Sequence, residues 1–405
     1  MKDILVINSG SSSIKFALYQ HEPAGNERGF DGLCLRYQGH LSGIGSGRPP
    51  GLSLKDERGE TIDAPRGLVS QKRLDHHGAI DGLIGWVERQ GLANLSAVGH
   101  RIVHGGRSYH TPMVLDAEVI RDLEAFIPLA PLHQPYGLEP AKRLAELRPG
   151  LPQVACFDTA FHTTQPRVAR EFALPRELTD KGLIRYGFHG LSYDYINRVL
   201  PDHLAGAPGE RVIVAHLGNG ASMCAIKDGR SITSTMGFTA VEGLTMGTRC
   251  GSLDPGLVLH LIDQEGMNTQ QVSELLYKRS GLLGMSGISS DMRELLESPT
   301  PEARDAIALF VHRIVREIGS LAAAMGGLDQ LVFTAGIGER AVAVRQAVGE
   351  QSRWLGIELD DQANACNATK VSSEASRVGV WVIPTDEERM IAWYTANHLQ
   401  QSASA

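Results

Sequence analysis

The sequence predicts an α/β protein whose two duplicated domains face a cleft. With 405 residues, the chain is long for one hydrophobic core, so two domains are expected. Residues 4–19 are predicted to form a strand, a polar turn rich in Gly and Ser, and a second strand, and residues 211–226 repeat this order. The other segments alternate between predicted helices and strands, which is typical of α/β folds.

Composition and charge exclude several classes of protein. Hydrophobic residues make up 42% of the chain and charged residues 21%, as in ordinary globular proteins, and the net charge of −7 argues against a general nucleic-acid binder. No apolar run is long enough to span a membrane, and Ile4–Ile7 is too short for a signal peptide. The five cysteines lack CxxC spacing. We therefore expect a reducing cytoplasm, with neither a disulfide framework nor a zinc site.

One α/β region is predicted in the first half of the chain. The predicted strands are Ile4–Ile7, Ile14–Tyr19, Ala97–Val103 and Gln153–Phe157, and the predicted helices are Asp116–Phe126 and Glu139–Leu147. Residues 39–73 are rich in Gly, Pro and charge, so they are predicted to be an excursion that carries a hairpin and has little catalytic interest.

The second half begins with a strand, a turn and a strand over Arg211–Ile226, followed by a third strand after the turn at Asp228-Gly229. Later elements are a long amphipathic helix at Glu302–Met325 and strands at Gln330–Thr334 and Val378–Ile383. Residues 335–339 are predicted to open one more helix, and residues 385–388 to begin the last one.

Three Gly-containing turns, at residues 8–13, 217–222 and 335–340, have the composition of phosphate-binding loops. Their backbone N–H groups can reach a phosphate because glycine has no Cβ to block the approach. Neither the Walker A pattern nor G-x-G-x-x-G occurs. Each segment alone is as compatible with a purely structural turn as with a phosphate-binding one. The three together, with Lys15 beside the first, favour phosphate binding.

Two arginines stand in apolar or Gly-rich surroundings. Arg101 ends a predicted buried strand just before Gly105-Gly106, and Arg249 lies between Gly247 and Gly251. An arginine in such a place needs an anion, and its planar fork suits a carboxylate or a phosphate. A structural pair with Asp or Glu is an equally good interpretation of either residue alone.

The fifteen histidines do not predict a metal site. His100 and His104 have the spacing of a helical zinc pair, but they lie in a predicted strand, where four residues span about 13 Å. His162 and His189 occur singly, and a lone histidine is more often a hydrogen-bonded structural residue than a catalytic one.

A series of motifs covers residues 4 to about 395 outside a divergent region at 25–75: NSGSSSIK, GHRIVHGG, APLHQP, FDTAFH, RYGFHG, HLGNGAS, GLTMGTRCG, GISSDMREL, FTAGIGER and IPTDEE. In these motifs and their order, the sequence resembles the acetate kinase family. The resemblance implies duplicated ribonuclease H-like (actin-like ATPase) domains with a nucleotide cleft between them. The first domain would be residues 1–160, completed by a helix at 389–405. Residues 161–388 would bind the nucleotide and form a dimer.

The resemblance further implies reversible in-line phosphoryl transfer from ATP to acetate, which produces acetyl phosphate and ADP. The cofactor would be Mg²⁺, or Mn²⁺ in its place. A carboxylate is already ionised at pH 7, so no general base is required. The implied protein is a cytoplasmic homodimer that binds acetate or another short-chain carboxylate, and neither nucleic acid nor membrane. Alternatives are a propionate or butyrate kinase and an actin- or chaperone-like ATPase.

The family's functional positions map onto residues of this chain. By resemblance, the catalytic residues are Arg101, Asp158, His189 and Arg249. Those around the acid are Arg101, Val103, Leu132, His133, Phe188 and Ala240. Those around the nucleotide are Asn8, Ser11, Ser13, Lys15, His216, Leu217, Gly218, Asn219, Gly220, Asp291, Met292, Arg293, Gly336, Ile337, Gly338, Glu339 and Arg340.

The resemblance assigns the metal ion to Asn8 and Glu387, with Asp158 among the acidic residues around it. Magnesium prefers such oxygen ligands and keeps several waters. Glu387 has a structural alternative, because an acidic residue in the first turn of a helix interacts favourably with the helix dipole.

Several positions depart from the family pattern. Ala240 stands where many members have proline, and its smaller side chain could admit an extra methylene, worth about 0.8 kcal/mol of burial. Propionate is therefore expected to compete with acetate. Tyr193 stands where a second histidine is common, and Ser252 replaces a carboxylate two residues after Cys250. Arg340 replaces an asparagine, which leaves the nucleotide preference open.

Overall fold

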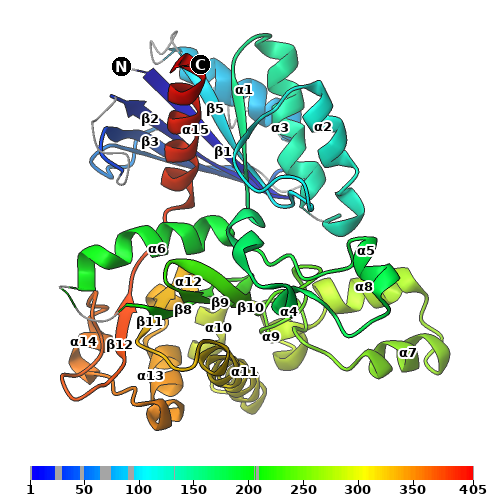
Figure 1. Ribbon diagram of the computed structural model, residues 1–405, viewed down its shortest axis with the longest axis vertical. Coiled ribbons are helices and arrows are strands. Elements are labelled where there is room, and N and C mark those ends of the chain that lie inside the picture. The colour runs from blue at the N-terminus through cyan, green and yellow to red at the C-terminus, as the bar shows by residue number, and fades with distance from the viewer. Residues whose placement is uncertain are drawn as a thin grey trace. The chain divides into compact units, whose positions relative to one another are not determined.

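A computed structural model describes residues 2–22, 30–45, 50–63, 74–89, 95–131, 133–204, 206 and 209–404. They belong to two compact units (Figure 1): residues 1–160 with 386–405, called unit 1, and residues 161–385, called unit 2. Within the described ranges, no helix is both long and apolar enough to cross a membrane. The assignment of nucleotide binding and dimer formation to the second half stays a prediction.

Unit 1 is built on a seven-stranded sheet in the order β4-β3-β2-β1-β5-β7-β6. Its strands are β1 (Lys2–Ser9), β2 (Ser13–His21), β3 (Leu33–Ser42), β4 (Gly51–Asp56), β5 (Leu95–Ile102), β6 (Met113–Val114) and β7 (Gln153–Phe157). β1, β5 and β7 are parallel, and the other pairs are antiparallel. The four predicted strands of this half are confirmed. The predicted hairpin is β3–β4, which begins at Leu33, before the predicted excursion.

The helices of unit 1 are α1 (His76–Arg89), α2 (Ala117–Glu124), η1 (Ile127–Leu129), α3 (Gln134–Leu147) and α15 (Glu387–Ser404). Asp116 caps α2 by accepting hydrogen bonds from the backbone N–H groups of Glu118 and Val119. α3 begins before the predicted Glu139, because Pro135 in its first turn already has helical φ.

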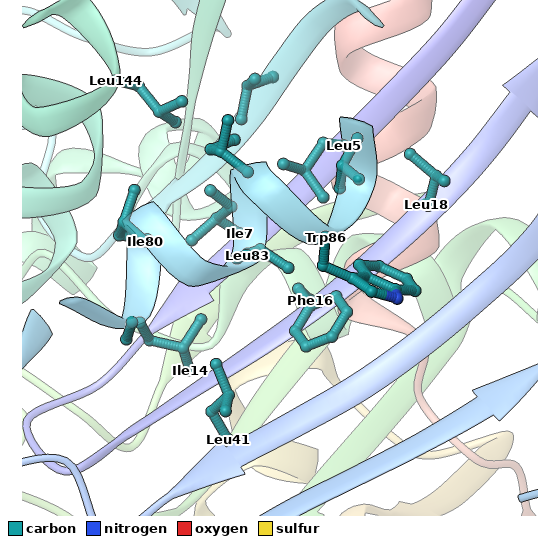
Figure 2. Close-up of a cluster of buried hydrophobic side chains, with 14 of the residues drawn as sticks. Leu5, Ile7, Ile14, Phe16, Leu18, Leu41, Ile80, Leu83, Trp86 and Leu144 are labelled. Carbon is teal, nitrogen blue, oxygen red and sulfur yellow. The ribbon is translucent and has the colours of Figure 1, made fainter. Parts of the chain in front are cut away.

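Two helices cover opposite faces of the unit 1 sheet. On one face, Trp86 of α1 packs edge-on against Phe16 of β2, with ring centroids 5.6 Å apart (Figure 2). On the other face lies α15: a Cβ on Gly99 of β5 would stand 2.4 Å from Oγ1 of Thr395 and 2.6 Å from Cγ2 of Ile391. The last helix of the chain therefore completes the core of the first unit, and Gly99 is required for its close approach.

Unit 2 repeats this sheet in shorter form. Its order is β10-β9-β8-β11-β12, from β8 (Arg211–Leu217), β9 (Ala221–Lys227), β10 (Arg230–Ser234), β11 (Gln330–Thr334) and β12 (Gly379–Val382). Three consecutive antiparallel strands are followed by two parallel ones beside the first, as with β1, β2, β3, β5 and β7. The matching order and directions support the duplication that the repeated strand–turn–strand pattern predicts.

The remaining elements of the chain are η2 (Ala160–Thr164), α4 (Arg167–Arg170), α5 (Arg176–Asp180), α6 (Gly190–Leu204), α7 (Pro255–Asp263), α8 (Thr269–Lys278), α9 (Gly281–Ser286), α10 (Met292–Glu297), α11 (Pro301–Met325), α12 (Ala335–Arg340), α13 (Val342–Gln351), η3 (Arg353–Leu355) and α14 (Asp361–Ala365). The long predicted helix is α11. It is capped at its start by Thr300 and at its end by Gly326, which has φ of +76°.

The prediction that residues 335–339 open a helix is confirmed, because they lie in α12. The interpretation of residues 335–340 as a Gly-rich turn is wrong, since these residues are helical. Ala335, with φ of +63°, makes the left-handed step that follows β11, so Gly336 and Gly338 lie inside the helix. A left-handed alanine is strained, and such strain often accompanies functional sites.

Candidate active site

Four of the predicted functional residues of unit 1 lie at one edge of its sheet. Asn8 is near the end of β1, Arg101 near the end of β5, and Asp158 directly after β7. Because these strands are parallel, their carboxyl ends meet at the same edge, where α/β proteins commonly bind ligands. Glu387 is the first residue of α15, and hydrogen bonds connect it to this group through Asn8.

Arg101 and Asp158 form a buried ion pair. Nε of Arg101 donates to Oδ1 of Asp158 at 3.3 Å and Nη2 donates to Oδ2 at 2.5 Å, with the Asp158 side chain fully buried. Burial opposes the charge on Arg101, but attraction by Asp158 and Glu387 outweighs it and raises the pKa of Arg101. The structure thus provides the carboxylate partner that the sequence left open, and it keeps Arg101 charged and oriented.

Burial also raises the pKa of Asp158 to about 6, against the opposing effect of Arg101, while nearby Glu387 adds a further upward shift.

Asn8 connects Arg101 to the two glutamates at the start of α15. Its Nδ2 donates to Oε1 of Glu388 at 3.1 Å and to Oε2 of Glu387 at 3.4 Å, and Nη1 of Arg101 lies 3.5 Å from its Oδ1.

The donor set of this group suits magnesium. Within the described residues, no three His, Cys, Asp or Glu side chains gather closely enough to hold a metal ion by themselves. Magnesium does not require such a cage, because it is usually held by one or two carboxylates together with phosphate oxygens and water. The oxygens of Asn8, Asp158 and Glu387 fit that pattern.

The turn at residues 8–13 is a tight hairpin between β1 and β2. The backbone N–H of Gly10 donates to the carbonyl of Ser13 at 2.8 Å, and Asn8 pairs with Lys15 in the strand register. Ser11 and Lys15 are exposed and Ser13 is partly exposed, so their side chains are accessible to a ligand. Nε2 of His76, at the start of α1, lies 2.9 Å from the carbonyl oxygen of Gly10 and ties the turn to this helix. Phosphate contact by the turn stays a prediction.

In unit 2, His189 and Arg249 converge beside the second Gly-rich turn. The backbone N–H of Gly218 donates to the carbonyl of Gly220 at 3.2 Å, which closes the turn between β8 and β9. A Cβ on Gly220 would stand 3.6 Å from Nε2 of His189 and 3.8 Å from Nη1 of Arg249. The imidazole edge and the guanidinium therefore reach the same side of Gly220.

His189 occupies a strained position. Its φ of +58° is unusual for a residue with a side chain, and it directly precedes α6. Its ring stacks on that of His216, with centroids 4.1 Å apart and an interplanar angle of 16°.

His162 is by contrast a structural residue, because it is fully buried and both of its ring nitrogens have partners. Its Nδ1 lies 2.9 Å from Oγ of Ser231, and its Nε2 lies 2.9 Å from the carbonyl oxygen of Phe188.

Arg249 is oriented by backbone. Its Nη1 donates to the backbone carbonyl of Ala240 at 3.0 Å, so Ala240 contacts Arg249 through its backbone.

The other residues predicted around the acid come from several parts of the chain. Phe188 and Val103 are buried apolar residues, and His133 is the residue before α3. Leu132 lies outside the described residues. An apolar acid-binding pocket at Val103, Leu132, Phe188 and Ala240 stays a prediction.

A pocket of about 460 Å³ in unit 2 brings together many of the predicted nucleotide residues. Its lining comprises Gly218, Asn219, Ser290, Asp291, Met292, Arg293, Leu296, Gly336, Ile337, Arg340 and Ala341. His216, Leu217, Gly220, Gly338 and Glu339 are not part of this lining. Arg293 is paired with Asp291 through bonds of 3.1 and 2.6 Å. Sequence reasoning missed Leu296, although it follows Met292 by one helical turn and so faces the same side.

Arg345 of α13 is a further residue that the sequence did not single out. It is fully buried and donates to the carbonyls of Gly338 and Asn364 and to Oδ1 of Asn364 and Asn367, at 2.6–3.0 Å. Burial lowers its pKa. Arg345 thereby holds α12, which lines the pocket, against α14. An arginine in a helix is usually exposed, so no signal in the sequence indicates this role.

Comparison with known proteins covers both units. The model of the acetokinase family matches residues 3–393. An acetate kinase from Rhodopseudomonas palustris is 53% identical over 401 residues, or 97% of each chain, and one from Methylocella silvestris is 48% identical over 99% of each chain. Two solved structures are also similar. A propionate kinase from Francisella tularensis subsp. tularensis has a TM-score of 0.88 and 36% identity, and an acetate kinase from Porphyromonas gingivalis has 0.85 and 37%. Each alignment covers 98% of this chain and 100% of the other.

Proposed function

Because the chain belongs to the acetokinase family, we propose that it catalyses reversible phosphoryl transfer between ATP and acetate, with acetyl phosphate and ADP as products. The protein is an enzyme, a kinase that uses ATP and a divalent metal ion. The structural observation that best supports the proposed reaction is the convergence of His189 and Arg249 beside Gly220. Phosphoryl transfer requires mainly that the charge of the moving group be neutralised and that the reactants be held in line.

In unit 2, we assign the phosphoryl group to His189 and Arg249, and the nucleotide to the pocket beside Asn219. The Gly218–Gly220 turn has room for phosphate oxygens because it carries no Cβ on its Gly residues. Asp291, Met292 and Arg293 on one side and Gly336, Ile337 and Arg340 on the other are suited to hold the nucleoside.

In unit 1, we assign the carboxylate of the acid to Arg101, which Asp158 keeps charged and fixed in orientation. Asn8, Asp158 and Glu387 would hold Mg²⁺, which neutralises phosphate charge when it is bound. The substrate carboxylate is ionised at neutral pH and attacks directly, so none of these residues has to remove a proton from it. Because the enzyme uses ATP, we expect it to act in the cytoplasm.

Acyl-phosphate formation tests this function. The purified protein is incubated with ATP, Mg²⁺ and either acetate, propionate or butyrate, and the product is trapped with hydroxylamine. We expect acyl hydroxamate from acetate, with propionate competing because Ala240 is smaller than the proline of many relatives. No product from any acid would contradict the kinase assignment, and ATP hydrolysis without product would favour an actin- or chaperone-like ATPase. A higher kcat/KM for propionate would change the preferred acid.

We further propose that two copies of the chain associate through α7 of unit 2. This helix buries none of its residues, and Leu257 and Leu259 are 44% and 61% exposed. Two apolar side chains this exposed on one short helix make it a candidate for contact with another protein. The resemblance to a family of homodimers indicates that the partner is a second copy of this chain.

Light scattering after size exclusion tests the association. The wild type is expected to have the mass of a dimer, and Leu259→Glu that of a monomer, because a buried charge is costly at an apolar contact. Leu174→Glu is the matched control, since Leu174 is 51% exposed elsewhere in unit 2. A dimeric Leu259→Glu or a monomeric wild type would exclude this interface.

A further inference from the structure

A chain of hydroxyl groups leads from α6 to the ring of His189. Nδ1 of His189 lies 2.8 Å from Oγ of Ser222, and Oγ of Ser222 lies 2.5 Å from the hydroxyl of Tyr193. Tyr193 and Ser222 are both fully buried. Tyr193 is in the first turn of α6 and His189 directly precedes that helix, four residues earlier, while Ser222 is in β9. The fold brings Ser222, which is distant in sequence, between the other two.

The acidities of the groups set the direction of its hydrogen bonds. A phenol has a pKa near 10 and is a far better donor than an aliphatic alcohol. Tyr193 therefore donates to Oγ of Ser222, and the proton of Ser222 is directed to Nδ1 of His189. A neutral imidazole that accepts at Nδ1 carries its proton on Nε2. Nε2 is the atom that faces the space beside Gly220, close to Arg249.

A second contact fixes the plane of the same ring. His216 of β8 stacks on His189 and is the cross-strand partner of Ser222. Nδ1 of His216 lies 2.8 Å from Oγ of Ser192, which directly precedes Tyr193 in α6. Ser192 and Tyr193, which are successive residues of α6, thus hold both stacked rings. Ser192 contacts His216 directly, and Tyr193 reaches His189 through Ser222. This support is consistent with the strained backbone of His189, which needs its surroundings to keep it in place.

We propose that Tyr193 and Ser222 are positioning residues that hold His189 as the Nε2–H tautomer, so that it donates a hydrogen bond to the transferring phosphoryl group. The inference rests on the proposed function for its catalytic consequence. The hydroxyl of Tyr193 touches neither acid nor nucleotide in this assignment and acts on His189 through Ser222.

Steady-state kinetics of three variants test the proposal. Tyr193→Phe removes a single oxygen, and Ser222→Ala removes the group between Tyr193 and His189. Each is expected to lower kcat about tenfold, the effect of one lost hydrogen bond. The KM values for ATP and for the acid should stay within about twofold, because only the orientation of a transition-state donor is lost. The double variant should be no slower than Ser222→Ala, since both act on one chain.

Nitrogen NMR of protein labelled with ¹⁵N-histidine gives a readout that does not depend on turnover. We expect His189 to show the Nε2–H tautomer in the wild type and a mixture of tautomers in Tyr193→Phe and Ser222→Ala. The signal of His189 is identified by its loss in His189→Gln. If the wild type forms no acyl phosphate, the proposed function fails, while the tautomer measurement still tests the hydrogen-bond chain.

Tyr186→Phe is the matched control. Tyr186 is also buried and close to His189 in sequence, but its hydroxyl donates to the carbonyl of Gly182 at 2.8 Å. This variant should keep wild-type kcat and the wild-type tautomer. Thermal unfolding checks that each variant is folded, and Tyr193→Phe carries the test if Ser222→Ala is not. The proposal is overturned if Tyr193→Phe matches Tyr186→Phe in both measurements, or if the double variant loses the product of the two single effects.

Discussion

Arg249→Leu is expected to lower kcat for acyl-phosphate formation by about three orders of magnitude, the scale seen when one preorganised donor to a developing charge is lost. The arginine reaches the space beside Gly220 and donates to the backbone carbonyl of Ala240. Leucine can neither donate there nor neutralise phosphate charge. Because that carbonyl lies in a partly exposed loop, its loss of a partner should cost little stability, and the melting temperature should change little.

Arg304→Leu is the control for this variant. Arg304 lies on the exposed surface of α11 and also donates to a backbone carbonyl, that of Pro299, at 2.7 Å. Its replacement removes the same positive charge and a comparable bond without approaching the turn at Gly220. We expect wild-type turnover from Arg304→Leu. If Arg249→Leu keeps more than a tenth of wild-type kcat in the hydroxamate assay, Arg249 is not part of the site.

Glu387→Ala is expected to lower kcat at least about a hundredfold and to raise the Mg²⁺ concentration needed for half-maximal rate. Glu387 begins α15, beside the amide of Asn8 and near the buried pair of Arg101 and Asp158. Removing its carboxylate takes away an oxygen donor of the proposed metal group. It also removes a favourable helix-dipole contact, which is worth only about 0.3–1 kcal/mol, so the fold should persist.

Glu388→Ala separates the two interpretations of Glu387. Glu388 lies in the same first turn and also accepts a hydrogen bond from Asn8, at 3.1 Å. Its loss removes a similar helix-dipole contact but no assigned metal ligand, so we expect activity within a few-fold of wild type. Equal losses in the two variants, without any change in Mg²⁺ dependence, would show that Glu387 acts only as a structural residue of the helix.

The sequence predicted the strands well and the helices less well. Strand–turn–strand segments such as residues 4–19 combine apolar runs with Gly-rich turns, and both signals are local. α1 was not predicted, because its sequence contains three glycines that lower helix propensity. Burial of Trp86 against Phe16 overrides this preference. Residues 335–339 do open a helix, as predicted, but their two glycines also suggested a phosphate-binding turn, whereas Ala335 makes the left-handed step and both glycines are helical.

Sequence alone determined the family, the repeated unit that opens each half, and the residue types that can neutralise phosphate, because motifs and periodicity are local in the chain. Only the tertiary structure decided which partners those residues have. Asp158 pairs with Arg101 because β5 and β7 are parallel neighbours, and Tyr193 reaches His189 through Ser222 because α6 meets β9. Hydrogen bonds form within about 3 Å, so strand register and helix packing determine these contacts, and spacing along the chain does not.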